Sequence, residues 1–353
     1  MNPITSEAVR NVLRTIKGPD LESDIVSLGL LSEILIADGK VFFSITVPEG
    51  GVQEWESLRR SAEKMVCALE GVESVVVTLT AEKTTKAASR RRANLLPIKM
   101  PIEGVRHVIA VASGKGGVGK STMAINIALA LQDSGFKTGV MDADIYGPSL
   151  PRLTGLVNQK PQLIGEKKLQ PLEKFGLKLM SMGFLVEEEK PVVWRGPMVM
   201  AAVTQLLRDV VWGPLDVLVV DMPPGTGDAQ LTLAQQVQLT GALVVSTPQD
   251  LALVDARKAI EMFMKVNVPI LGLIENMSYF IAPDTGKRYD IFGYGGARAE
   301  AERREVPFLA EIPLDAALRF SSDEGVPIFV AKPTEELAKL YRKIVDQIKN
   351  KFF

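Results

Sequence analysis

The chain carries, from Val111 to Thr122, the stretch Val-Ala-Ser-Gly-Lys-Gly-Gly-Val-Gly-Lys-Ser-Thr, and this stretch decides its fold. It fits the pattern G-x-x-x-x-G-K-[ST], a glycine-rich loop whose backbone N–H groups cradle the phosphates of a nucleotide. The apolar residues His107–Ser113 predict a buried strand before the loop, and Ser121–Ser134 predict a helix after it, which Gly135 ends. Strand, loop and helix in this order are the context that phosphate binding requires.

Each residue type in the loop has a role in this chemistry. Glycines let the phosphates approach the backbone closely and permit positive φ angles. The Lys120 ammonium can neutralise the β- and γ-phosphate oxygens, and the Ser121 hydroxyl can coordinate Mg²⁺. The predicted nucleotide-binding residues of the loop are Gly114, Lys115, Gly116, Gly117, Val118, Gly119, Lys120, Ser121 and Thr122.

Lys115 is a second cation in the loop, directly after its first glycine. One interpretation is a solvated surface lysine. The alternative is charge stabilisation of a nucleotide held by a neighbouring subunit, as an arginine finger acts in trans. Because the rest of the loop up to Lys120 is glycine and valine, we favour the second interpretation. It predicts a homodimer with ATP sandwiched at the interface and gives Lys115 a catalytic role.

From residue 107 onward, apolar segments alternate with segments of helical periodicity. The predicted strands are Val108–Ala112, Thr138–Asp142, Val217–Asp221, Leu243–Thr247, Ile270–Glu275 and Phe308–Ile312. The predicted helices after the first are Val199–Val211, Thr226–Leu239, Leu251–Val266, Ala297–Arg304 and Thr334–Lys351. The strands are near-continuous apolar runs, as expected for a parallel sheet covered on both faces. We therefore predict an α/β fold over residues 107–353: a doubly wound, mainly parallel sheet of the P-loop NTPase type, with ligands at the carboxyl ends of its strands.

Three carboxylates end two of these strands. Asp221 directly follows the apolar residues Leu218, Val219 and Val220. An apolar strand that ends in a carboxylate is the pattern of a strand that helps to bind Mg²⁺. Asp142 and Asp144 stand at i and i+2, so both side chains point to the same face while the strand persists. We assign Asp144 to orienting the attacking water and Asp142 to the Mg²⁺ shell. The alternative for this pair is a solvated strand end.

Two further segments suit nucleotide recognition. Pro223–Asp228 follows the Asp221 strand, has flexible glycines and is expected to sense the γ-phosphate, although an ordinary strand-to-helix turn would look similar. Asn276, at the end of a predicted strand, presents a donor and an acceptor that suit the edge of adenine; the alternative is a structural turn residue. Since the chain has no N-K-x-D sequence for guanine, ATP is favoured over GTP.

The N-terminal part of the chain predicts a separate small domain over residues 1–81, of pattern α-β-β-α-β. Asp38-Gly39 stands between two apolar runs, which is a strong hairpin signal. Residues 82–106 carry seven Lys or Arg against two Glu, with Pro97 and Pro101, and predict a flexible basic linker. The charge run could contact a partner or nucleic acid, but a solvated tether is the favoured interpretation.

Composition excludes several classes of protein. The net charge is −1 with an isoelectric point of about 6.1, so no overall field favours nucleic acid or an anionic membrane. No 18-residue apolar run and no basic-then-apolar leader occurs, which predicts a cytoplasmic protein. The amphipathic C-terminal helix, Leu337–Ile348, is expected to pack on the sheet edge; a membrane-surface helix is the alternative.

The motifs taken together resemble a known family. Lys-Gly-Gly-Val-Gly-Lys-Ser-Thr, Asp-Ala-Asp-Ile-Tyr-Gly-Pro-Ser and Asp-Met-Pro-Pro-Gly-Thr-Gly-Asp are similar to segments of the deviant Walker A ATPases of the MinD/ParA superfamily. Ser246–Ala252 and Glu275–Phe280 are similar to the Mrp/ApbC iron–sulfur cluster carrier ATPases within that class. Asp24–Leu30 resembles the small SufT-like domain that often precedes them. The resemblance implies Mg²⁺-dependent ATP hydrolysis by a homodimer that delivers clusters to apo iron–sulfur proteins or works with cluster assembly factors.

The resemblance also implies a bridging [4Fe–4S] cluster, for which this chain lacks the family's ligands. The family's C-x-x-C stands where this sequence has Ala282-Pro283-Asp284-Thr285. Such a cluster takes four thiolates, whereas a homodimer of this chain has only two cysteines, both Cys67. Cys67 is expected to be a partly buried thiol of the second helix rather than a ligand. No iron–sulfur ligand is therefore identified.

Three functions remain under comparison. The first is an ATP-hydrolysing switch in iron–sulfur cluster assembly or transfer. The second is a spatial organiser resembling the MinD and ParA ATPases, which use a similar dimer on membrane or DNA. The third is an ATP-dependent regulator that carries no cluster itself. The Tyr146–Ser149 loop and the SufT-like domain favour the first, and neither a membrane nor a specific nucleic acid is an expected partner.

Overall fold

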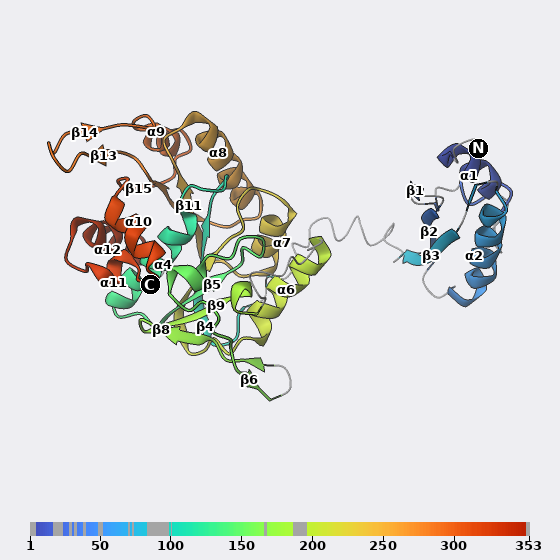
Figure 1. Ribbon diagram of the computed structural model, residues 1–353, viewed down its shortest axis with the longest axis horizontal. Coiled ribbons are helices and arrows are strands. Elements are labelled where there is room, and N and C mark those ends of the chain that lie inside the picture. The colour runs from blue at the N-terminus through green and yellow to red at the C-terminus, as the bar shows by residue number, and fades with distance from the viewer. Residues whose placement is uncertain are drawn as a thin grey trace. The chain divides into compact units, whose positions relative to one another are not determined.

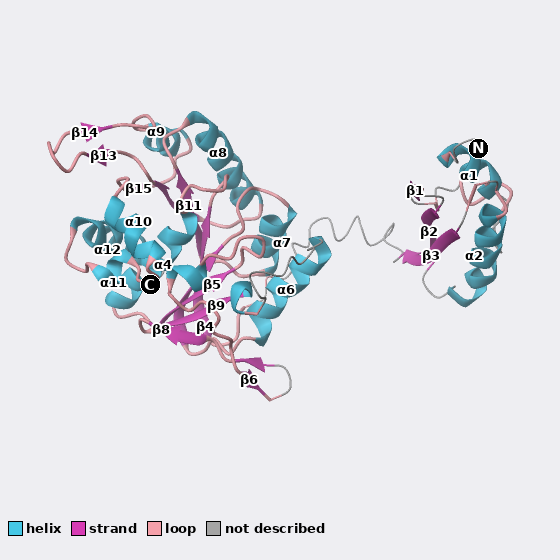
Figure 2. Cartoon of the chain, in the orientation of Figure 1, coloured by secondary structure: helices cyan, strands magenta, loops and turns pink. Residues whose placement is uncertain are grey.

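The computed structural model divides the chain into two compact units, Met1–Leu96 and Pro97–Phe353. Figure 1 follows the chain from the N-terminus in blue to the C-terminus in red, and Figure 2 distinguishes its helices from its strands. The structure describes residues 5–16, 24–27, 30–31, 34–37, 40–48, 52–69, 71–72, 74–82, 99, 101–165, 168–185 and 196–350. The Asp38-Gly39 turn and most of the predicted linker lie outside the described residues.

The N-terminal unit has the α-β-β-α-β order that the sequence predicts. Its elements are α1 (Ser6–Leu13), β1 (Leu35–Ala37), β2 (Lys40–Pro48), α2 (Val52–Cys67) and β3 (Ser74–Glu82). β2 pairs with β1 antiparallel and with β3 parallel. Alternate residues of β2 point to the core, because the side-chain period of a strand is two. The core consists mainly of Val9, Leu13, Val41, Phe43, Ile45, Trp55, Leu58, Ala62, Val66, Val75 and Val77.

Cys67 is the last residue of α2 and is exposed, so the expectation of a partly buried thiol is wrong. The core-facing residues of α2 recur at helical spacing as Leu58, Ala62 and Val66. Cys67 follows Val66 by one residue, which turns it about 100° away from that face. The thiol therefore lies beside Arg60 and Lys64 at the surface.

The main unit is built on an eight-stranded sheet of order β15-β12-β11-β4-β10-β5-β9-β8. Its strands are β4 (Val105–Ala112), β5 (Thr138–Asp142), β8 (Leu172–Lys174), β9 (Leu177–Ser181), β10 (Leu215–Asp221), β11 (Gly241–Ser246), β12 (Ile270–Glu275) and β15 (Phe308–Glu311). All neighbouring strands are parallel except β8, which is antiparallel to β9. The predicted doubly wound, mainly parallel sheet is confirmed.

Helices cover both faces of this sheet (Figure 2). They are α4 (Lys120–Asp133), α5 (Leu150–Leu153), α6 (Gly196–Asp209), α7 (Asp228–Gln236), α8 (Asp250–Lys265), α9 (Gly296–Arg303), α10 (Ala316–Asp323), α11 (Ile328–Ala331) and α12 (Glu336–Lys349). The short pieces are β6 (Leu163–Ile164), β7 (Lys168–Leu169), η1 (Met182–Phe184), β13 (Phe280–Ile281) and β14 (Arg288–Tyr289). α4 is buried on almost every side, which fixes the helix that follows the glycine-rich loop.

The predicted elements differ from the observed ones mainly at their ends. β5 and β12 have the predicted bounds, while β4 begins at Val105, inside the predicted linker, because Val105 pairs with Leu215 of β10. Lys99, also in that predicted linker, donates from Nζ to the Val266 carbonyl at 2.9 Å. The last part of the predicted linker therefore belongs to the main unit.

The C-terminal helix α12 packs on the edge of the main unit, as expected. Its apolar stripe, Leu337, Tyr341, Ile344, Val345 and Ile348, is buried in the main core. The helix contacts α4 and the edge strand β15. Among the residues that the structure describes, none of the helices combines the length and the apolar character needed to cross a membrane.

Candidate functional site

A cleft of about 210 Å³ lies at the carboxyl ends of β4, β5 and β10. These strands are neighbours in register, and Asp221 pairs with Val111 on one side and with Asp142 on the other. Parallel strands bring their carboxyl ends to one edge of a sheet, and this gathers the predicted residues. The cleft is lined by Ser113, Gly116, Gly117, Gly119, Lys120, Ser121, Thr122, Asp144, Ser149, Leu153 and Pro224.

The glycines of the loop are required for two different reasons. Gly117 and Gly119 have φ angles of +81° and +85°, which L side chains rarely adopt. At Gly114 the reason is space, since a Cβ there would lie 2.1 Å from the carbonyl carbon of Asp255 in α8. Gly119 has both constraints, because a Cβ would come within 2.2 Å of Asn276 Nδ2. The loop is thus held against α8 and the end of β12.

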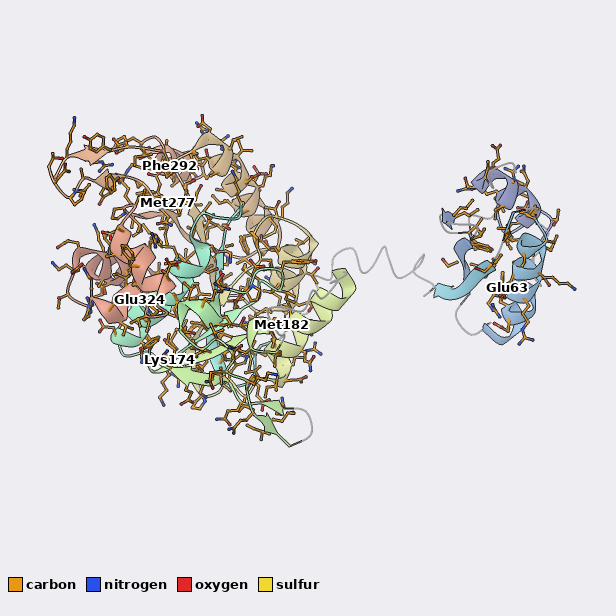
Figure 3. All side chains as sticks on the ribbon, viewed as in Figure 1. Glu63, Lys174, Met182, Met277, Phe292 and Glu324 are labelled. Carbon is orange, nitrogen blue, oxygen red and sulfur yellow. The ribbon has the colours of Figure 1, made fainter. Side chains whose placement is uncertain are left out.

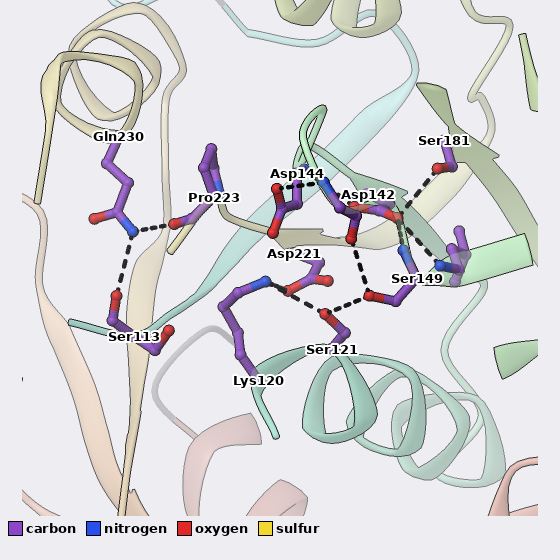
Figure 4. A network of polar contacts seen from close by, with 12 residues as sticks. Ser113, Lys120, Ser121, Asp142, Asp144, Ser149, Ser181, Asp221, Pro223 and Gln230 are labelled. Atoms are coloured by element: carbon purple, nitrogen blue, oxygen red, sulfur yellow. Dashed lines mark hydrogen bonds and ion pairs between the residues drawn. The ribbon is translucent and has the colours of Figure 1, made fainter. Parts of the chain in front are cut away.

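Lys120 and Asp221 form a buried ion pair at the base of the cleft (Figure 4). Both side chains are almost fully buried, with 6% and 4% exposed. Lys120 Nζ also lies 3.4 Å from Ser121 Oγ. Burial raises the pKa of the Asp221 carboxyl, and the Lys120 charge opposes that shift. Each charge is thereby compensated in a place where water is largely excluded.

Asp142 anchors the segment that follows β5 rather than facing the cleft. Its Oδ2 accepts hydrogen bonds from Ser149 N at 3.0 Å, Leu150 N at 3.1 Å and Ser181 Oγ at 3.1 Å. Burial, and next the nearby charge of Asp221, raise the pKa of Asp142 to about 7. With Oδ2 occupied in this way, the contacts of Asp142 support an anchoring role and give no support to the expected place in the Mg²⁺ shell.

Asp144 borders the cleft, two residues beyond the end of β5. Its backbone N–H donates to Asp142 Oδ1 at 3.0 Å, and its Oδ1 accepts from Gly147 N at 3.2 Å. The second bond holds the carboxylate at the start of the loop that leads to α5. Asp144 is half-buried, so it can contact both the loop and a molecule in the cleft.

Lys115 is exposed, and its main chain is held from within the loop. Ser113 Oγ donates to the Lys115 carbonyl at 2.9 Å. The neighbouring Gly114 packs against α8, as described above. The structure therefore presents the Lys115 side chain at the surface on a fixed backbone, beside the cleft and outside it.

Asn276 lies behind the loop, buried to 97%, since 3% of its surface is exposed. Its Nδ2 donates to the Val118 carbonyl at 2.8 Å. Its Oδ1 has no hydrogen-bond partner among the described residues. The side chain thus supports the loop through its donor and keeps its acceptor unused.

Four polar residues of the site were missed by the sequence interpretation: Ser113, Ser149, Ser181 and Gln230. Ser149 Oγ lies 3.4 Å from Ser121 Oγ, and Gln230 contacts the Ser113 and Pro223 carbonyls (Figure 4). Ser113 and Ser149 stand in motif segments, the Val111–Thr122 stretch and the Tyr146–Ser149 loop, but neither was assigned a role. Ser181 and Gln230 reach Asp142 and the Ser113 carbonyl only when distant segments come together, so no local pattern signals those contacts.

Ala282-Pro283-Asp284-Thr285, where the resemblance implies a C-x-x-C, lies between β13 and β14. Pro283, Asp284 and Thr285 are exposed, and Ala282 is half-buried. Met277 and Phe292, which bracket the hairpin, lie at one end of the main unit (Figure 3). Within the described residues, no group of three or more His, Cys, Asp or Glu side chains could hold a metal ion.

Two family profiles match the chain. The ParA profile, described as NUBPL iron-transfer P-loop NTPase, matches residues 104–349. A second profile, described as iron-sulfur cluster assembly protein, matches residues 6–79. The two matches cover the main and N-terminal units respectively.

Curated relatives carry names of the same kind. An iron-sulfur cluster carrier protein of Synechocystis sp. is 44% identical over 99% of this chain and 98% of its own length. The iron-sulfur cluster transfer protein NUBPL of Mus musculus is 50% identical over 75% of this chain and 84% of its own length. The first of these relatives spans both units.

Solved structures show the same fold in the main unit. A nucleotide-binding protein of Archaeoglobus fulgidus, solved in complex with ADP, is 38% identical over 68% of this chain and 93% of its own, with a TM-score of 0.59. The cell division ATPase MinD of Pyrococcus furiosus is 24% identical over 69% of this chain and 98% of its own, with a TM-score of 0.50. The second likeness concerns the fold alone.

Proposed function

Because the chain belongs to the iron–sulfur cluster carrier family of P-loop NTPases, we propose that it is an ATP-hydrolysing homodimeric switch in the assembly of iron–sulfur clusters or their transfer to apoproteins. The observation that carries the proposal is the buried Lys120–Asp221 pair at the base of the cleft beside the glycine-rich loop. Matches to an iron–sulfur assembly domain and to cluster carriers favour this function over a spatial organiser.

The donor set at the base of the cleft fits Mg²⁺. Ser121 Oγ and the Asp221 carboxylate are hard oxygen donors, which Mg²⁺ prefers. When bound with the nucleotide, Mg²⁺ neutralises charge on the β- and γ-phosphates. Ser121 and Asp221 would hold the metal, and Lys120 would face the phosphate oxygens. Each buried charge would then still have a counter-charge, which limits the cost of keeping it buried.

Hydrolysis needs a water held in line with the γ-phosphate. Asp144 borders the cleft and has a carboxylate that can accept a proton from that water or orient it. The water oxygen forms a bond to the γ-phosphorus as the bond from the γ-phosphorus to the β,γ-bridging oxygen breaks. The bridging oxygen leaves with ADP, and the water proton passes to Asp144 or to the released phosphate. Lys120 and the amides of Gly114–Ser121 stabilise the phosphate charge as it develops.

Lys115 supplies the contribution of the second subunit. Its side chain is exposed on a loop whose backbone is fixed by Ser113 and α8. A cation presented in this way suits a phosphate in a neighbouring copy better than one in its own cleft. We therefore assign Lys115 to charge stabilisation in trans across a dimer that holds the two nucleotides at its interface.

Asn276 supports ATP over GTP. Its Oδ1, for which the described residues offer no partner, is an acceptor. The exocyclic group of adenine is an amino donor, whereas guanine carries a carbonyl at the equivalent position. A buried acceptor that faced a guanine carbonyl would remain unpaired. Discrimination against GTP then follows from the cost of that unpaired group.

The residues at 282–285 do not fit the family's cluster. Ala282, Pro283, Asp284 and Thr285 offer no thiolate, and Cys67 lies in the other unit. The proposed switch acts instead on partners whose own cysteines hold the cluster as cargo.

The proposal is tested with the purified full chain. We expect Mg²⁺-dependent turnover of ATP, much weaker turnover of GTP, and a dimer that forms with a non-hydrolysable ATP analogue. Anaerobic incubation with iron and sulfide, followed by quantification of both, should leave no stoichiometric cluster on the chain. An absence of ATP turnover contradicts the switch, and a stoichiometric, transferable cluster contradicts the account of the cargo.

A further inference from the structure

Gln230 is a buried amide that none of the roles above uses. It lies in the first turn of α7, and 1% of its surface is exposed. Its Nε2 donates to the Pro223 carbonyl and, at 3.4 Å, to the Ser113 carbonyl (Figure 4). Its Oε1 has no hydrogen-bond partner in the part of the chain that the structure describes. Burying an amide with an unused acceptor costs free energy, so a purely structural role would be poorly served by this residue.

The two carbonyls that Gln230 joins belong to different functional segments. Ser113 is the residue before the glycine-rich loop, and Pro223 begins the loop expected to sense the γ-phosphate. Gly225 N also donates to the Ser113 carbonyl, at 3.0 Å. Ser113 Oγ in turn donates to the Lys115 carbonyl at 2.9 Å. One short chain of hydrogen bonds therefore runs from Gln230 through Ser113 to the backbone of Lys115.

We propose that Gln230 is a positioning residue that latches the Pro223–Gly227 loop to Ser113 and so sets the backbone that carries Lys115. This inference rests on the proposed ATP switch. In that switch, Gln230 would link the Pro223–Gly227 loop, which senses the γ-phosphate, to Lys115, which acts on the neighbouring subunit. Gly225 has a φ angle of +94° and Gly227 precedes α7, so the loop has the conformational freedom to move.

The two contacts of Gln230 indicate which hydrogen bond breaks when the Pro223–Gly227 loop moves. Gln230 lies on the helix into which the loop leads, and it bonds to Pro223 at the start of that loop. It therefore moves with the loop, and its longer contact, to Ser113, is the one that breaks. Its Oε1, which bonds to none of the described residues, is then available to a backbone N–H of the loop in its second arrangement. A pair of alternative hydrogen-bond sets of this kind gives two discrete states.

Two variants test whether the hydrogen bonds donated by Gln230, and not the volume of its side chain, matter for turnover. Gln230→Met preserves the approximate volume and removes both donated bonds. Gln230→Glu preserves an acceptor but places a carboxylate oxygen against the Ser113 and Pro223 carbonyls. The matched control is Gln236→Met in the same helix, where the amide oxygen accepts from Thr204 Oγ1 at 3.2 Å on an exposed side.

The latch predicts a change in turnover without a change in nucleotide binding. We expect Gln230→Met to lower kcat about tenfold, the equivalent of about 1.4 kcal/mol, with ADP affinity unchanged, and Gln230→Glu to lower kcat further. Gln236→Met should keep the wild-type kcat. Loss of thermal stability in Gln230→Met with an unchanged kcat per folded molecule would show a structural amide and overturn the latch.

Amide hydrogen exchange tests the same coupling without turnover. In the wild type, residues 113–119 and 222–227 should change protection together when ADP is replaced by a non-hydrolysable ATP analogue. In Gln230→Met the response should remain in 222–227 and become smaller in 113–119, where only the direct contacts of the loop amides with the phosphates are left. If the wild-type segments respond independently, the latch is wrong, even where a variant fails to fold. If they respond together but ATP is not turned over, the latch stands and the proposed hydrolytic function fails.

Discussion

The phosphate-loop cleft and the β13–β14 hairpin belong to one unit but are built in opposite ways. In the cleft, the charges are buried and compensated, as the Lys120–Asp221 pair shows. In the hairpin, the residues at the expected cluster position are mostly exposed and lack thiols. The difference teaches that the proposed nucleotide site does not depend on the hairpin: the residues proposed for the first lie in one cleft, and the hairpin lacks the thiols that the resemblance implies.

The largest expected effect comes from removing the central cation of the cleft. Lys120→Ala should lower ATP turnover about a thousandfold, because the phosphate charge loses its closest stabilising group. It also leaves the buried Asp221 carboxylate without its cation. Steady-state turnover and nucleotide titration measure the effect, with Lys332→Ala, a surface lysine paired with Glu335, as the control. Near-normal turnover in Lys120→Ala would contradict the assignment of this cleft.

Removal of the exposed cation should have a smaller and more selective effect. Lys115→Ala should lower turnover about a hundredfold while each chain still binds ADP normally, since the lost charge acts on the neighbouring copy. Sedimentation with a non-hydrolysable ATP analogue checks whether the dimer is also weakened. The control is Lys339→Ala on α12, another exposed lysine. Normal turnover and normal dimerisation in Lys115→Ala would remove the trans role.

The anchoring of Asp142 predicts an effect on stability. Ser181 Oγ donates to Asp142 Oδ2 and accepts from Gly183 N at 3.0 Å. Ser181→Ala therefore removes one of the three hydrogen bonds to the buried Asp142 Oδ2 and takes this acceptor from the Gly183 N–H. The free energy of unfolding should fall by about 1–3 kcal/mol. Chemical denaturation measures it, with Ser322→Ala, which loses only a bond within α10 to the Leu318 carbonyl, as the control. Equal stability losses in the two variants would show that the Asp142 network is not special.

Substitutions in the β13–β14 hairpin should have the smallest effect on ATP turnover. There we predict that added cysteines allow the chain to bind an iron–sulfur cluster. The double variant Ala282→Cys, Thr285→Cys restores C-x-x-C and gives a dimer four hairpin thiolates, the number a [4Fe–4S] cluster takes. Anaerobic reconstitution should load this variant with about one cluster per dimer, while ATP turnover stays at the wild-type rate. If the variant binds no more cluster than the wild type, the missing thiols do not explain why the wild-type hairpin lacks a cluster.

Sequence reasoning reached the features that depend on neighbours in the chain. The loop residues from Gly114 to Thr122 follow from a local pattern, and the strands β5 and β12 follow from apolar runs. It missed β8 and β9, two of the strands at one side of the sheet, because the segments are short and their pairing partners lie elsewhere. It also misjudged Cys67, since exposure of a residue beside an apolar helical face depends on what that face covers.

In the candidate site, too, some features could be predicted from local motifs and others could not. Lys120, Ser121, Asp144 and the glycines line one cleft, and their placement follows from motifs at the ends of neighbouring strands. The contacts of Asp142 could not be predicted, because its partner Ser181 lies on a strand that sequence analysis did not find. Local patterns thus indicate which residues reach the site, and the tertiary fold decides what each one contacts.

A mixing experiment tests the central claim, a switch whose two subunits complete each other's sites, most directly. Lys115→Ala and Asp144→Ala should each be nearly inactive alone. In a mixed dimer, the Lys115→Ala subunit keeps its own Asp144 and receives Lys115 from its partner, so one of its two sites works. Equal mixing makes half of the dimers mixed, and the account predicts recovery of about a quarter of wild-type turnover. Turnover no higher than the average of the two variants alone would contradict it.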